Sequence, residues 1–104
     1  MTTPEPSTLV TTQLAGDRLI VKLHPTCVDF TNQELVAKEL ASSVSKATHV
    51  AVDLSSVKYV DNLGFESLLA AVKSCPGRVR FVNVSRSVVS LFALAHLDSL
   101  IEKS

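Results

Sequence analysis

A strand, a short polar loop and a helix follow one another without a break over residues 49–73, which read HVAVDLSSVKYVDNLGFESLLAAVK. Residues 50–54 are short, apolar and mostly β-branched, which predicts a central strand covered on both faces. Residues 63–74 have apolar side chains at helical spacing and precede a Cys-Pro-Gly stop, which predicts an amphipathic helix. This order places an exposed turn and a helix N-terminus at one edge of a sheet, where ligand and partner sites are commonly built.

The segments around this unit alternate between strand and helix patterns. Residues 8–14 and 18–24 flank an Ala-Gly-Asp turn and predict a β-hairpin. Thr31 and Glu34 have the spacing of a capping box, which predicts that a helix begins there. The apolar stripe expected on that helix consists of Leu35, Val36, Leu40, Ala41 and Val44.

The C-terminal part of the chain continues the same alternation. Residues 78–84 alternate apolar and polar side chains, which predicts a strand parallel to the central one after a right-handed crossover. A further helix is expected after Ser85-Arg86-Ser87, and residues 97–101 fit either a short edge strand or a helical tail. The pattern therefore predicts an α/β fold, with a mixed sheet of four or five strands packed against about three to four helices.

Length and charge limit the class of protein. A chain of 104 residues has room for one core, so we expect a flexible N-terminus over residues 1–7 and a single domain over residues 8–104. Lys+Arg and Asp+Glu number 10 each, which argues against nucleic acid as a partner. The chain shows no secretion signal and no long apolar run, so we expect a cytoplasmic protein without direct membrane insertion.

The central unit carries a family resemblance. Val-Asp-Leu-Ser-Ser-Val-Lys-Tyr-Val-Asp-Asn-Leu-Gly-Phe, over residues 52–65, resembles the STAS domain, the family of the bacterial anti-sigma-factor antagonists. Val28-Asp29-Phe30 and the segment from Phe81 to Phe92 are similar to two further parts of its pattern, so the resemblance extends over about residues 9–101. It implies a STAS-like single domain with a regulatory, protein-binding role.

The family's usual chemistry is missing at one point. Antagonists of the sporulation and stress type carry Asp-Ser-Ser-Gly, and a partner kinase phosphorylates the second serine; the matching positions here are Asn62 and Leu63. No phosphorylation is therefore expected at Asn62 or Leu63. The Asp-Thr-Ala-Gly form associated with phospholipid-transport ATPase complexes is also absent. A displaced phosphosite at Ser55, Ser56 or Ser67 remains open.

Two interpretations of the turn remain open. In the first, Asp61 or Asn62 only caps the helix, and Gly64 is present because the backbone is tight. In the second, the turn is the centre of a protein interface, because apolar residues displayed in a turn need a reason. The predicted partner-binding residues are Asp61, Asn62, Leu63, Gly64, Phe65, Glu66 and Ser67.

Three functions follow from these observations. The resemblance implies a module that docks on an anti-sigma factor or a histidine-kinase-like serine kinase, without the serine phosphoswitch. A second hypothesis is a regulatory or structural subunit of a stressosome-like scaffold or of a transporter ATPase complex. The third is a thiol enzyme that uses Cys27 with His24 as base, although no oxyanion-hole or phosphate-cradling loop accompanies them. We expect no catalysis, no cofactor and no metal.

Overall fold

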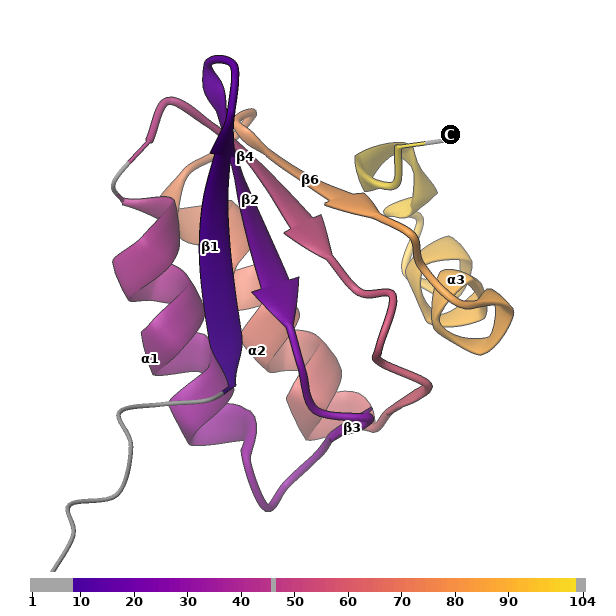
Figure 1. Cartoon of the computed structure of the whole chain (residues 1–104). Coiled ribbons are helices and arrows are strands. Elements are labelled where there is room, and N and C mark those ends of the chain that lie inside the picture. Colours follow the sequence, from indigo (N-terminus) through magenta and orange to yellow (C-terminus); the bar gives the residue numbers. More distant parts are fainter. Residues whose placement is uncertain (1–8, 46, 103–104) are drawn as a thin grey trace, which may run out of the picture.

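The fold was analysed in a computed structural model that describes residues 9–45 and 47–102. Its main sheet has the strand order β1-β2-β4-β6 (Figure 1). The strands are β1 (Val10–Ala15), β2 (Arg18–Leu23), β4 (His49–Asp53) and β6 (Val79–Val82). The first pair is antiparallel and the others are parallel, which confirms the predicted mixed sheet. The flexible segment predicted for residues 1–7 lies outside the described residues.

A second, very small sheet was not predicted. It consists of β3 (Cys27–Val28) and β5 (Tyr59–Val60), which pair in parallel. Two residues are too few to show an alternating pattern in a sequence. The small sheet nevertheless has a structural role, because it joins the loop that leaves β2 to the loop that enters the second helix.

The described residues form three α-helices beside the sheet: α1 (Gln33–Val44), α2 (Asn62–Ser74) and α3 (Arg86–Leu94). Helices α1 and α2 lie side by side on one face of the sheet, whereas α3 lies beyond β6 (Figure 1). The tail combines both predicted forms, since the 3-10 helix η1 (Asp98–Leu100) is followed by a parallel bridge between Ile101 and Phe81.

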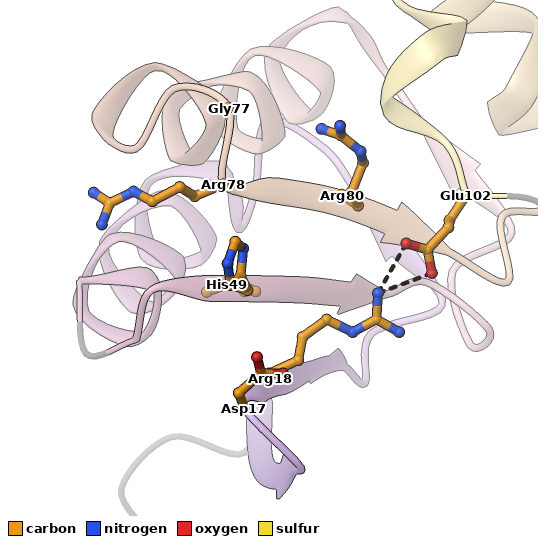
Figure 2. Close-up of a pocket in the computed structure, with 8 residues that line it drawn as sticks. Asp17, Arg18, His49, Gly77, Arg78, Arg80 and Glu102 are labelled. Carbon is orange, nitrogen blue, oxygen red and sulfur yellow. Dashed lines mark hydrogen bonds and ion pairs between the residues drawn. The ribbon is translucent and has the colours of Figure 1, made fainter.

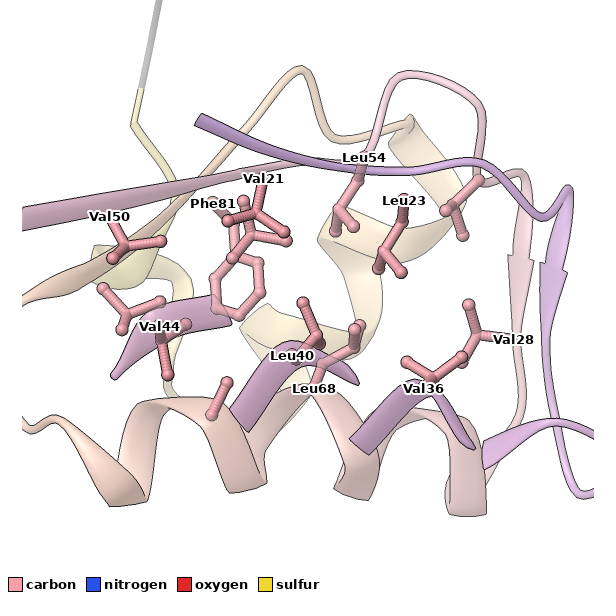
Figure 3. Packing of buried hydrophobic residues seen from close by; sticks show 14 of the residues in the cluster. Val21, Leu23, Val28, Val36, Leu40, Val44, Val50, Leu54, Leu68 and Phe81 are labelled. Atoms are coloured by element: carbon pink, nitrogen blue, oxygen red, sulfur yellow. The ribbon is translucent and has the colours of Figure 1, made fainter. Parts of the chain in front are cut away.

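The core lies between the sheet and the first two helices. Val21 and Leu23 of β2 point toward Leu40 of α1 and Leu68 of α2 (Figure 3), and all four side chains are fully buried. Phe81 extends the core toward α3, where the centroid of its ring lies 5.0 Å from that of Phe92. Burial of these side chains is the main source of stability and holds α2 in a fixed place on the sheet.

The predicted start and inner face of α1 were partly wrong. The helix begins at Gln33 with Asn32 at its N-cap, because Thr31 instead donates its N–H and hydroxyl to Asp29 Oδ1. Glu34 therefore stands in the first turn and completes no capping box. Val36, Leu40 and Val44 are buried as expected, whereas Leu35 and Ala41 are exposed and Ser43 is buried in their place.

Candidate functional site

The candidate site is built around Asp61, the N-cap of α2. Asp61 Oδ1 accepts a hydrogen bond of 2.7 Å from the Gly64 N–H, which satisfies one of the free backbone donors of the first turn. The backbone carbonyl of Asp61 accepts a second bond from Phe65 N–H at 2.8 Å. Of the two capping residues suggested by the sequence, Asp61 is therefore the one that caps the helix.

Asp61 also joins α2 to the loop that follows β3. The second carboxylate oxygen of Asp61, Oδ2, accepts a hydrogen bond of 3.0 Å from Phe30 N–H. The backbone N–H of Asp61 donates to the Val28 carbonyl at 3.1 Å. Within that loop, Asn32 Oδ1 accepts from Asp29 N–H at 3.0 Å. The loop is thus held both internally and against the helix start.

Gly64 and Ser67 lie beneath the surface, unlike the other predicted site residues. A Cβ added at Gly64 would overlap the carbonyl oxygen of Val28, so only glycine allows this approach of helix and loop. Ser67 is 3% exposed, and its hydroxyl donates to the Gly64 carbonyl at 2.6 Å. A displaced phosphosite at Ser67 would therefore require this turn of the helix to open.

Large apolar and aromatic side chains are exposed at this end of the domain. Leu63 is 45% exposed, and Asn62 and Glu66 on the same helix start are also exposed. Phe30 is 70% exposed, and Tyr59 of β5 is 55% exposed. We call this set the docking end: Phe30, Tyr59, Asn62, Leu63 and Glu66.

Sequence reasoning missed Phe30 as a member of this surface. The sequence pattern placed Phe30 only before a helix. In the structure, the backbone N–H of Phe30 donates to Asp61, which is 31 positions away in the chain. No local pattern reports such a contact. Phe65, in contrast, was predicted at the surface but is half-buried, because its ring packs edge-on against Phe92 with centroids 5.1 Å apart.

One carboxylate at this end of the sheet has a shifted pKa. Burial alone would raise the pKa of Asp53, at the end of β4, but hydrogen bonds outweigh it and the net direction is downward. The bonds come from Ser55 N–H at 2.8 Å and from the Asn83 amide at 3.3 Å, and the charge of Lys22 adds to them. The ionised form of Asp53 thus fixes the loop between β4 and β5.

Cys27 and His24, the residues of the hypothetical thiol enzyme, make no contact that points to catalysis among the described residues. Cys27 is an exposed free cysteine of β3, and the His24 ring lies 2.8 Å from the Thr11 hydroxyl of β1. Within residues 9–45 and 47–102, no group of three His, Cys, Asp or Glu side chains has the geometry of a metal site. No helix in the same part of the chain has the length and apolar character needed to cross a bilayer.

Comparisons with known proteins agree with the sequence resemblance. The family model of the STAS domain matches residues 9–104, which confirms it. The structure of an anti-sigma factor antagonist from Mycobacterium paratuberculosis superposes with a TM-score of 0.75 at 15% identity, over 88% of this chain and 80% of that chain. That of the anti-sigma factor antagonist SpoIIAA in its unphosphorylated form gives 0.69 at 14% identity, over 91% and 87%.

A membrane transporter contains the same fold. The structure of murine Slc26a9, an anion transporter in its inward-facing state, gives a TM-score of 0.66 at 20% identity, over 79% of this chain but only 14% of the transporter. At such identities the likeness concerns the fold alone. A search of curated protein sequences found no match.

Proposed function

The chain belongs to the STAS domain family, and we propose that it is a non-catalytic, protein-binding regulatory module of the anti-sigma-factor-antagonist type. In this proposal it acts in the cytoplasm and docks on a partner through the docking end. The structural likeness to two anti-sigma factor antagonists, each covered over most of its length, supports the class of protein. The exposed side chains at the start of α2 support the choice of the docking end as the surface that contacts the partner.

The exposure of Leu63 is the observation that carries the proposal. This side chain stands in the first turn of α2, 45% exposed, where the resemblance places the family's phosphoacceptor serine. Asp61 and the close contact between Gly64 and Val28 hold the backbone below it. A fixed, exposed apolar side chain is the kind of anchor around which small protein interfaces form.

The partner we propose is an anti-sigma factor or a histidine-kinase-like serine kinase. Such a kinase would find no hydroxyl at Asn62 or Leu63, so phosphorylation could not release the complex there. A phosphate would otherwise add about −1.5 to −2 charges to the centre of the contact. Binding is therefore constitutive with respect to this kinase.

The assigned surface can be tested by a pull-down with matched variants. Leu63→Asp places a charge at the centre of the docking end, yet an acidic residue in the first turn of a helix favours the fold. Leu14→Asp is the control, because Leu14 is 68% exposed in β1 and lies at the opposite end of the sheet. We expect Leu14→Asp to recover the kinase-type partner and Leu63→Asp to lose it. Equal recovery by both variants would reject the surface.

The missing phosphoswitch has a separate test. Leu63→Ser restores the hydroxyl at the position of the family's phosphoacceptor. When the captured kinase is given ATP, we expect the wild-type complex to persist and the Leu63→Ser protein to gain a phosphate at residue 63 and dissociate. Release of the wild-type protein by ATP would show that another switch operates.

The transporter likeness favours a second candidate, a subunit of a larger assembly. A STAS fold forms part of the chain of murine Slc26a9, and this chain would then stabilise a complex rather than switch it. Co-purification at a fixed stoichiometry that ATP does not change would favour this function. Exchange of the partner on addition of nucleotide would favour the first candidate, a module of the anti-sigma-factor-antagonist type.

A further inference from the structure

A charged hollow lies at the end of the sheet opposite to the docking end. Its volume is about 280 Å³, and Val50 and Gly77 contribute to its wall. Figure 2 shows its charged and polar side chains, which come from strands β2, β4 and β6, from the turns that precede β2 and β6, and from the C-terminal tail. We call it the cationic hollow, and these side chains are Asp17, Arg18, His49, Arg78, Arg80 and Glu102.

The basic side chains form a row across neighbouring strands. Arg18 of β2 is in register with His49 of β4, and Val50 N–H donates to the Arg78 carbonyl, which places Arg78 beside the start of β4. Arg80 of β6 is in register with Ala51, two residues after His49, and so points to the same side of the sheet as His49. Basic groups gathered on adjacent strands repel one another and cost stability unless something compensates them.

Compensation inside the protein is only partial. Glu102 binds Arg18, with Arg18 Nη1 at 2.8 and 2.9 Å from its two carboxylate oxygens. This is the one ion pair formed within the part of the chain that the structure describes. Arg78 and Arg80 therefore have no carboxylate partner among the described residues, and Asp17 is the only other acid of the hollow.

The donors of the hollow suit an oxyanion with several acceptor directions. His49 lies between the Arg18–Glu102 pair and the start of β6, Arg80 stands further along β6, and Arg78 extends outward at the rim (Figure 2). Arg78 is exposed, so its side chain can turn inward within nanoseconds. A planar carboxylate is satisfied by one guanidinium fork, whereas a tetrahedral phosphate accepts from donors on several sides.

We propose that the cationic hollow is a binding site for a phosphate group, contacted by Arg80, His49 and Arg78. The phosphate is either free inorganic phosphate or the head of a small phosphomonoester. The site is separate from the docking end and does not depend on the function proposed for it. Loss of partner binding would therefore leave this proposal intact.

Titrations followed by amide NMR test the site. Inorganic phosphate and glycerol 3-phosphate are added to the wild-type protein at low ionic strength, and the amide signals of Arg18, His49 and Arg80 should shift and saturate. Arg80→Gln should weaken binding about tenfold or more, since it removes a charge-assisted bond. Arg86→Gln, which removes an exposed arginine of α3, is the control and should bind as the wild type does.

The titrations test both the existence of the site and the identity of its ligand. Asp17→Asn should tighten binding, because it removes a carboxylate that repels the anion. Tighter binding of glycerol 3-phosphate than of inorganic phosphate would identify a phosphomonoester, and equal affinities would identify free phosphate. Shifts that do not saturate, or that are equal in Arg80→Gln and Arg86→Gln, would overturn the site. Tighter binding of succinate than of either phosphate would overturn the choice of ligand.

Discussion

The opposite ends of the main sheet carry opposite kinds of surface. At the docking end, the hydrogen bonds of the half-buried Asp61 carboxylate and a close backbone approach hold the backbone that carries exposed apolar side chains such as Leu63. At the other end, the cationic hollow consists mainly of long charged side chains, and Arg18 with Glu102 forms the one ion pair among its described residues. The first surface is rigid and suited to a protein, whereas the second is adaptable and suited to a small anion.

The largest effect should come from adding one methyl group at the docking end. Gly64→Ala forces a Cβ onto the Val28 carbonyl, which must move together with β3, so we expect a loss of about 3 kcal/mol or more in the free energy of unfolding. Urea denaturation followed by circular dichroism measures it.

The matched control is Gly16→Ala, at the tip of the hairpin on the opposite end. A Cβ there meets nothing within 4 Å, but the residue has φ of +69°, so only backbone strain of about 1 kcal/mol is expected. If both variants lost the same stability, close contact would not be what distinguishes the docking end.

Removing the carboxylate of Asp61 should have the next largest effect. Asp61→Ala loses the cap of α2 and the bond to Phe30, which together should cost about 2 kcal/mol. Ser85→Ala is the comparison, because Ser85 is the N-cap of α3 but makes no side-chain capping bond, and it should change stability little. Chemical denaturation measures the free energy of unfolding of both variants. Equal losses of stability in the two variants would contradict the role given to Asp61.

The ion pair of the opposite end should matter less. Arg18 and Glu102 are 37% and 40% exposed, so Glu102→Gln should cost less than about 1 kcal/mol, and the cost should shrink further in high salt. Thermal unfolding at low and high ionic strength measures it. A large, salt-independent loss would mean that the pair is part of a rigid structure, like that of the docking end.

The smallest effect that we expect is on the pH dependence of stability, through the carboxylate of Asp53. The pKa of Asp53 is lowered in the folded protein, so its contribution to stability is present above its unfolded pKa of about 3.9 and is lost as the pH falls through the folded value. Asp53→Asn should therefore lose stability at neutral pH, and its stability should decline less steeply than that of the wild type as the pH falls from neutral to below about 3.9. Denaturation midpoints across that range test it, and an unchanged decline would refute the assignment.

The sequence predicted most of the fold because the longer elements have clear periods. The hairpin, the crossover helix and the parallel return strand were all confirmed, as was the central strand, which was predicted over residues 50–54 and is found at His49–Asp53. The small β3–β5 sheet could not be predicted, since two residues show no period. On α1, periodicity favoured Leu35 over Ser43, but the start of the helix is set by Asp29 and Asn32, and Leu35 turns outward.

The candidate site was predicted in part, for reasons seen at single residues. The tight backbone expected at Gly64 is real, but its cause is Val28, which is distant in the chain. Phe30 was missed for the same reason, because only its bond to Asp61 brings it to the docking end. Local sequence patterns report turns and caps, whereas the segments that meet at a surface are decided by tertiary contacts.

Hydrogen exchange of the complex with the captured partner tests the central claim most directly, because it reports on both ends in one measurement. The account predicts slower amide exchange over residues 28–32 and 61–67 when the partner binds, and unchanged exchange over residues 77–80. Protection of residues 77–80 with unchanged exchange at the start of α2 would contradict the account.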